Sequence, residues 1–308
     1  MNKKNLVALI VLVAVAGVFL IINMNEPTER TFFYFGENSD NFHTIVLTDT
    51  ASTITLVKNS DTWEMTDPVE SPIKERQTED LLEKLTKAKT SSLPISVSEK
   101  AQKNYNVTDS LGTLITIFDN NGNELRKALI GKSDNYNFSY ARHPQSSEIY
   151  QLSENLSWTV RPDINSWREN VVLKLDTDNI LDFQVITQDR DYKFTYADSL
   201  WKFTENDLTQ DVEDNNAVMK KLLNRFKSLR ATDFLDKEFE NYEDLLNNPY
   251  LSIKINTSDE GAKVLTVIPY NTTSDLLQLG SQKSPLYLIQ KNVREDFNFE
   301  LDELVELK

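Results

Sequence analysis

Few residues of this chain carry the side chains that enzymes use for nucleophilic or metal chemistry. There is no cysteine, and the two histidines are His43 and His143. A thiolate nucleophile, a disulfide framework and a multi-histidine metal centre are therefore excluded. Neither histidine has a recurrent Ser, Asp or Glu partner that would indicate a catalytic triad, and no Gly-rich phosphate loop, Gly-x-Ser-x-Gly elbow or His-Glu-x-x-His helix occurs. We expect no catalytic residues, no metal and no cofactor.

Two groups of oxygen ligands could bind a cation. Residues 119–124 begin like a calcium loop, with alternating oxygen ligands and a central glycine, but the twelfth position, which needs a glutamate, is Ile130. A hairpin turn is the favoured interpretation. Asp176 and Asp178 stand two residues apart, a spacing that is common on solvated strand faces. The favoured interpretation of this pair is likewise a solvated surface.

The chain is acidic, which bears on both its partners and its chemistry. It has 48 Asp and Glu against 33 Lys and Arg among 308 residues, a net charge of −15. This balance argues against a nucleic-acid surface. With so many acids, some pair will lie at glycosidase distances whatever the function, so the abundance does not indicate a hydrolase. We expect a protein that is not an enzyme and that has no small-molecule ligand.

The N-terminal segment predicts a membrane anchor. Lys3 and Lys4 precede an uninterrupted run of apolar or small residues at 6–22. As a helix this run spans roughly 26 Å, close to the roughly 30 Å hydrocarbon core of a bilayer. The lysines before it predict a cytoplasmic N-terminus, a single span of a bacterial inner membrane and a periplasmic body. The alternative is a cleaved signal peptide, because residues 14–16 read Ala-Val-Ala.

An internal repeat organises the rest of the chain. Strands and a helix recur at an offset of about 138 residues, and the equivalent positions include three matched pairs, namely Trp63 with Trp201, Leu82 with Leu223, and Tyr105 with Tyr242. Trp63 and Trp201 each follow a turn, which favours packing over ligand stacking. We therefore predict an anchor at 1–30, a first unit at 31–172 and a second at 173–308.

Within each unit the hydrophobic pattern predicts hairpins around one helix. Apolar and polar residues alternate at 43–48, 53–58 and 62–66, whereas 78–90 has the apolar spacing of an amphipathic helix. Further strands are expected at 113–119 and 124–130. The predicted fold class is α+β, with a transmembrane helix followed by two tandem units, each a mainly antiparallel sheet with one packed helix.

Several motifs in the chain resemble those of a bacterial family of unknown function, DUF4340. They are ITLV at 54–57, WEMTDPV at 63–69, the helix with Leu81, Leu82 and Leu85, ALIG at 128–131, YAR at 140–142, EIY at 148–150, WRENVV at 167–172 and DTDNI at 176–180. The resemblance implies an envelope protein that is often encoded beside ABC transporter components of the gliding-motility type, with no established catalytic residues. The family usually has Gly-Leu after Tyr105, whereas this chain has Asn106 and Val107, so we expect that turn to differ.

The C-terminal stretch is the best candidate for a partner-binding surface. Phe297, Phe299 and Leu301 alternate with polar residues. They predict a final strand that runs into a short helix and covers the second sheet, or else an acidic, apolar edge that a partner binds.

These observations lead to one functional hypothesis and two alternatives. We expect a non-catalytic, membrane-anchored envelope protein that is an accessory or scaffolding subunit of an ABC-type transporter or gliding-type complex; the transporter partner is implied by the family resemblance. The first alternative is a module that recognises glycan or cell-wall polymer through exposed aromatic residues. The weakest is an acid-pair hydrolase.

Overall fold

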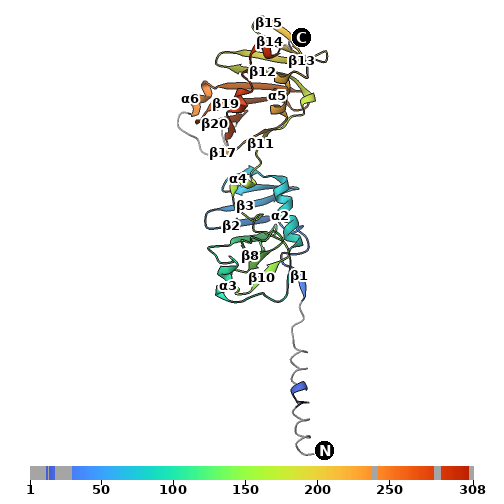
Figure 1. Cartoon of the computed structure of the whole chain (residues 1–308), viewed down its shortest axis with the longest axis vertical. Helices are drawn as coiled ribbons and strands as arrows, with labels where there is room; N and C mark the ends of the chain where they lie inside the picture. Colours follow the sequence, from blue (N-terminus) through green and yellow to red (C-terminus); the bar gives the residue numbers. More distant parts are fainter. Residues whose placement is uncertain (1–11, 13, 18–29, 237–241, 281–285, 305–308) are drawn as a thin grey trace, which may run out of the picture. The chain divides into compact units, whose positions relative to one another are not determined.

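The computed structural model of the chain describes residues 12, 14–17, 30–236, 242–280 and 286–304 (Figure 1). The chain forms two compact units. Unit 1 comprises Met1–Pro68 and Glu75–Pro162, and unit 2 comprises Val69–Lys74 and Asp163–Lys308. The main division thus lies between Pro162 and Asp163, and the short segment Val69–Lys74 also belongs to unit 2.

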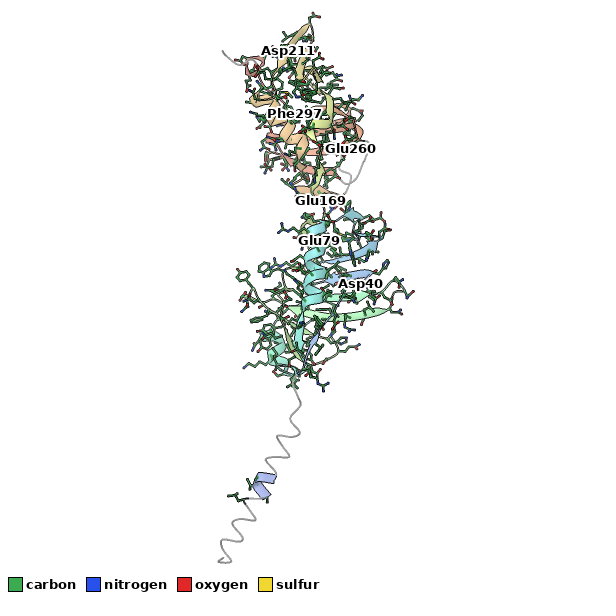
Figure 2. All side chains as sticks on the ribbon, turned by 90° about the vertical axis from the view of Figure 1, so that its right-hand side faces the viewer. Asp40, Glu79, Glu169, Asp211, Glu260 and Phe297 are labelled. Carbon is green, nitrogen blue, oxygen red and sulfur yellow. The ribbon has the colours of Figure 1, made fainter. Side chains whose placement is uncertain are left out.

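Unit 1 is built on an antiparallel sheet in which its own strands follow the order β10-β9-β8-β7-β2-β3-β4. Buried and less buried residues alternate along β2, where Ile45 and Leu47 are fully buried. The amphipathic helix α2 (Glu75–Lys87) buries Leu81 and Leu85, whereas Glu79 is exposed (Figure 2). The strands are β2 (Thr44–Thr48), β3 (Thr53–Asn59), β4 (Thr62–Asp67), β7 (Thr113–Phe118), β8 (Glu124–Gly131), β9 (Ser139–Arg142) and β10 (Ile149–Leu152).

Unit 2 is built on an antiparallel sheet with the order β15-β14-β13-β12-β18-β19-β20-β21-β17. Helix α5 (Ala217–Lys227) covers one face, where the ring of Phe226 lies 4.9 Å from that of Phe183. The strands are β12 (Ile180–Thr187), β13 (Asp191–Ala197), β14 (Leu200–Glu205), β15 (Leu208–Val212), β17 (Asp233–Leu235), β18 (Leu251–Thr257), β19 (Gly261–Pro269), β20 (Ser274–Leu279) and β21 (Leu286–Gln290).

Short elements complete both units. In unit 1, β1 (Thr31–Phe33) pairs with β6 (Lys89–Ser91), and α3 (Glu99–Asn104) precedes β7. In unit 2, β11 (Val171–Leu173) pairs with β16 (Leu229–Arg230). The remaining elements of unit 2 are β5 (Ser71–Pro72), α4 (Ile164–Trp167), η1 (Thr177–Asn179), α6 (Tyr242–Asn247), α7 (Asn292–Glu295) and η2 (Leu301–Leu304).

The fold is thus a mixture of strands and few helices in mostly antiparallel sheets, as the hydrophobic pattern predicts. Most of the predicted anchor at 6–22 lies outside the described residues. Among the residues that are described, no helix combines the length and apolar character needed to cross a bilayer.

The turn after α3 has the backbone of a glycine turn although it contains asparagine. Asn106 has a φ of 56°, in the left-handed region, and its Nδ2 donates a hydrogen bond to the carbonyl of Lys132 at 3.1 Å. Asparagine is among the few residues other than glycine that adopt this region readily. Asn106 therefore takes a backbone conformation that glycine also favours.

Replacing Asn106 separates its backbone role from its side-chain role. Asn106→Gly keeps the left-handed conformation and loses one exposed hydrogen bond, so we expect a change in unfolding free energy below about 1 kcal/mol. Asn106→Val puts a β-branched residue at positive φ, which we expect to cost about 1–2 kcal/mol. Chemical denaturation of both variants measures the difference; equal stabilities would contradict this account of the turn.

Candidate functional site

Two predicted repeat positions meet in a pocket of unit 2. Trp201, on β14, and Leu223, on α5, line a cavity of about 270 Å³ together with Tyr196, Asp178 and Asp214. Trp201 is buried, and its ring lies 5.2 Å from that of Tyr196, which is 41% exposed. Asp178 and Asp214 are exposed. Two carboxylates beside aromatic rings can accept hydrogen bonds from the hydroxyls of a sugar, or they can attract a cation.

The other repeat positions lie on separate elements. Trp63 is half-buried on β4, opposite Lys58 of β3, and Leu82 is half-buried on α2. Tyr105 ends α3, with its ring 4.2 Å from that of Tyr140. Tyr242 begins α6, and its side chain lies outside the described residues. Of these residues, Tyr105 packs its ring against another element.

Neither oxygen-rich segment presents a preformed cation site. The carboxylate of Asp119 accepts hydrogen bonds from the backbone of Asn121 and Asn123, both at 2.8 Å, and from Asn123 Nδ2 at 2.9 Å. These bonds lower the pKa of Asp119, and the side-chain bond from Asn123 has the largest effect. They also close the turn of the β7–β8 hairpin. Asp176 accepts a hydrogen bond from the backbone nitrogen of Asp178 and caps η1. Among the described residues, no group of three His, Cys, Asp or Glu could hold a metal ion.

The histidines also lie in loops of unit 1. His43 precedes β2 and lines a polar cavity of about 400 Å³ with Asp40, Lys58 and Asp119. His143 Nδ1 accepts a hydrogen bond from the backbone nitrogen of Gln145 at 3.2 Å, within the β9–β10 turn. The backbone of His43 is hydrogen-bonded to Phe118 and Lys58 beside β2, and His143 lies between β9 and β10.

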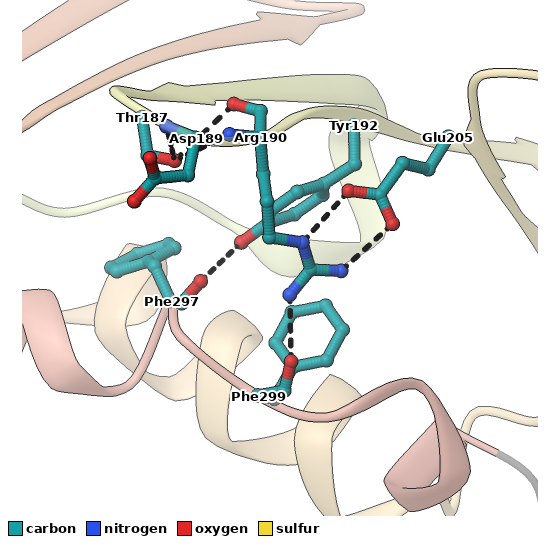
Figure 3. A network of polar contacts seen from close by, with 7 residues as sticks. All are labelled: Thr187, Asp189, Arg190, Tyr192, Glu205, Phe297 and Phe299. Carbon is teal, nitrogen blue, oxygen red and sulfur yellow. Dashed lines mark hydrogen bonds and ion pairs between the residues drawn. The ribbon is translucent and has the colours of Figure 1, made fainter.

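The C-terminal stretch is fastened to the sheet of unit 2 (Figure 3). Phe297 and Phe299 are buried in the core, whereas Leu301 is 39% exposed. Arg190 donates to both oxygens of Glu205, at 2.7 and 2.9 Å, and to the carbonyl of Phe299 at 2.6 Å. The predicted strand is replaced by an irregular segment that leads into η2. The stretch thus covers the sheet, which leaves Leu301 as the partner-binding candidate at the surface.

Tyr192 completes this network from β13. Its hydroxyl donates a hydrogen bond to the carbonyl of Phe297 at 2.7 Å, and the Arg190 guanidinium lies 5.0 Å from its ring centroid. The side chain is 1% exposed, and burial raises its pKa above the ordinary value of 10.0 despite the neighbouring Arg190. Folding therefore favours the neutral phenol.

This pKa shift predicts a pH dependence. Above pH 10, an unfolded tyrosine loses its proton while Tyr192 in the fold keeps it, so the folded state holds more protons and its stability falls as pH rises. Tyr192→Phe should cost about 1 kcal/mol at pH 7, because the Phe297 carbonyl loses its donor. The difference in unfolding free energy between this variant and the unaltered chain should shrink above pH 10. Denaturation curves from pH 7 to 11 measure this, and parallel curves would contradict it.

A second cavity adjoins the network. It measures about 360 Å³ and is lined by Arg190, Arg294, Tyr250 and Glu295, among others. Arg294 stacks on Tyr250 at 4.2 Å, and its Nε lies 3.2 Å from a carboxylate oxygen of Asp275. Asp275 is wholly buried, and its oxygens accept no hydrogen bond from the described residues. Burial raises its pKa, opposed by Arg294. Arg294 thus links the buried carboxylate of Asp275 to the ring of Tyr250.

Sequence reasoning missed an ion pair that is made by a wholly buried arginine. Arg168, in the WRENVV motif, is wholly buried and donates to both oxygens of Asp236 at 2.8 and 2.9 Å. Its guanidinium stacks on Phe234 at 3.9 Å, and its Nε donates to Ser71 Oγ at 3.3 Å. The motif marked Arg168, but nothing in the sequence connected it with Asp236.

Comparison with known proteins identifies the family. The model of the family described as Domain of unknown function (DUF4340) matches residues 33–249. The matched range includes all the motifs on which the resemblance was based, and it ends before Asp275 and Phe297. No curated protein and no solved structure matches the chain. Because the match covers well over half of its length, the chain belongs to the DUF4340 family.

Proposed function

We propose that this protein is a non-catalytic scaffolding subunit anchored in the bacterial inner membrane by residues 6–22, with its body in the periplasm. The observation that carries the proposal is the short distance in sequence between the apolar run and the folded body. Residues 23–30 alone separate the run from β1. They span at most about 28 Å when extended, so unit 1 stays near the bilayer.

The charged clusters support a scaffolding role. Arg168 and Asp236 pair within unit 2 and join residues 68 positions apart, and Arg190 with Glu205 fastens the C-terminal stretch. The charged atoms of these side chains form hydrogen bonds with other groups of unit 2. Charged groups that pair within the fold stabilise a rigid body, and a scaffold requires a rigid body that another protein can recognise.

We also infer that the body is a tandem duplication. Ile45 pairs with Leu56 and Ile117, and Phe183, at an offset of 138, pairs with Phe194 and Ile255 at that same offset. The order β4-β3-β2-β7-β8-β9-β10 recurs as β14-β13-β12-β18-β19-β20-β21. Equal strand order and register in two sheets support a common origin.

The change of offset in the repeat has a local cause under this proposal. In unit 1 Ile115 pairs with Ala128, and in unit 2 Ile253 pairs with Leu265. The first positions differ by 138 and the second by 137. Nearer the turn, Phe118 pairs with Glu124 and Asn256 with Ala262, and both positions differ by 138, so the additional residue of unit 1 is the bulge at Leu125 of β8. A β-bulge adds one residue to one strand and leaves the pairing on either side of it in place.

The proposed partner is a membrane component of an ABC-type transporter or gliding-type complex, as the family resemblance implies. The test is quantitative affinity purification of the full chain from detergent-solubilised membranes. The control carries residues 1–30 of this chain on an unrelated periplasmic body. Enrichment of transporter subunits with the full chain over the control is expected. Recovery of no membrane protein above the control would contradict the proposal.

A second candidate function, recognition of glycan or cell-wall polymer, is favoured by the pocket beside Trp201. Tyr196 is its exposed aromatic residue, and Asp178 and Asp214 offer hydrogen-bond acceptors. Sedimentation of the protein with purified cell-wall polymer tests this role. Tyr196→Ala should reduce sedimentation without lowering the melting temperature if the pocket binds polymer; equal sedimentation of both proteins would exclude this pocket.

A further inference from the structure

A stripe of exposed apolar side chains runs along one edge of unit 1. The segment 93–97 lies beside β10, where Ile95 N donates to the carbonyl of Ile149 at 2.8 Å and Ile149 N donates to the carbonyl of Ser96 at 2.9 Å. Leu93, Ile95 and Val97 are 38%, 44% and 59% exposed. Pro94 and Ser96, which lie between them, are less exposed than all three. We call these three residues the apolar stripe.

The stripe adjoins the point where the folded body begins. The backbone nitrogen of Arg30 donates to Ser92 Oγ at 3.0 Å, and Ser92 N donates to the carbonyl of Arg30 at 2.7 Å. Leu93, the first residue of the stripe, follows directly. Figure 1 shows β1, β10 and α3 at the same end of unit 1. The stripe therefore lies beside Arg30, and residues 23–30 are all that separates the apolar run at 6–22 from β1 in the sequence.

The charges around the stripe differ in sign from those of the whole chain. Although the protein carries −15, exposed basic residues outnumber acidic ones on the elements that flank the stripe. The basic residues are Arg30, Lys89, Lys100 and Lys103, against Glu99 and Glu148. Basic residues around exposed apolar side chains are typical of surfaces that contact anionic lipid.

We propose that the apolar stripe and its basic rim rest on the lipid bilayer, with Leu93, Ile95 and Val97 among the headgroups of anionic phospholipids. The inference rests on the proposed anchoring by 6–22 and adds a second contact with the same membrane. The anchor keeps the effective concentration of the stripe at the surface high, so a contact that is weak by itself persists. The second contact fixes which end of unit 1 faces the lipid.

The absence of native cysteine makes a direct test possible. Full-length protein with a single Ile95→Cys substitution receives a nitroxide label and is reconstituted into vesicles of phosphatidylglycerol and phosphatidylcholine. The matched control is Ile186→Cys on β12 of unit 2, since the two isoleucines are 44% and 45% exposed. Paramagnetic resonance then measures how accessible each label is to oxygen, which concentrates in lipid, and to a water-soluble nickel chelate. Thermal melts check that both labelled proteins fold.

The outcomes separate this inference from the proposed function. Flotation with the vesicles tests anchoring first, and a chain that stays at the bottom of the gradient contradicts the proposed function itself. In floated protein we expect the label at 95 to show several-fold lower nickel accessibility than the label at 186, with higher oxygen accessibility. Replacing Lys100 and Lys103 with glutamate should reduce this difference. Equal nickel accessibility at 95 and 186 overturns the inference, and so does shielding of label 95 from both reagents, which indicates a protein contact.

Discussion

Removing the carboxylate that pairs with Arg168 is expected to destabilise unit 2 strongly. Arg168 is wholly buried, so Asp236→Ala leaves its guanidinium without an ionic partner and away from water. Breaking a buried ion pair from one side costs about 3–5 kcal/mol. Because the Asp236 side chain is 38% exposed, we expect the lower end of that range, about 3 kcal/mol.

Two further variants separate charge from packing at this site. Arg168→Ala should cost a similar amount, since it removes the stacking on Phe234 and leaves a cavity. Arg168→Met fills much of the space without charge and should be less harmful than Arg168→Ala. Chemical denaturation measures all three. The control is Lys193→Ala, which breaks the more exposed pair with Asp182 and should cost below about 1 kcal/mol. A cost for Asp236→Ala no larger than that of Lys193→Ala would refute a structural role for the buried pair.

The second large effect is expected at Gly131, where β8 ends. A Cβ added to Gly131 would lie 2.0 Å from the carbonyl oxygen of Tyr105 and 3.0 Å from Cγ1 of Val107. The nearest atom belongs to the backbone, so no rotamer change relieves the clash, and α3 and β8 must separate. Gly131→Ala should therefore cost about 3 kcal/mol, at the upper end of ordinary overpacking.

A second glycine provides the comparison for this prediction. Gly122, in the β7–β8 turn, has a φ of 79°, but no atom of another element lies within 4 Å of the position that a Cβ would take there. Gly122→Ala should therefore cost only the backbone strain, about 1 kcal/mol. Thermal and chemical denaturation compare the two variants. A melting temperature of Gly131→Ala equal to or above that of Gly122→Ala would contradict the close approach of α3 to β8.

The regular strands were predictable because one face of each is buried. Residues 43–48 and 53–58 alternate apolar and polar side chains, and β2 and β3 occupy almost the same residues. By contrast β20 lacks this alternation. Its residues 275–278, including Asp275 and Gln278, are all buried, so the pattern of period two is lost.

Long-range contacts set the limit of prediction from the sequence. The alternation of Phe297 and Phe299 suggested a strand, yet their carbonyls accept hydrogen bonds from the side chains of Tyr192 and Arg190 instead of a neighbouring strand. Side-chain donors from distant elements satisfy the backbone there, and no local pattern encodes them. The pairing of Arg168 with a residue 68 positions away was hidden for the same reason. The pocket beside Trp201 likewise depends on the packing of α5 against β14.

The central claim is that residues 6–22 hold this body at a membrane. Alkaline carbonate extraction of cell membranes tests it most directly, with the double variant Leu12→Arg/Val15→Arg as control, because two arginines in the middle of a span cost about 5–7 kcal/mol of insertion free energy. We predict that the unaltered chain stays in the membrane pellet at its full-length mass and that the double variant is released. Release of the unaltered chain into the supernatant, or a mass that shows cleavage after Ala16, would contradict the account.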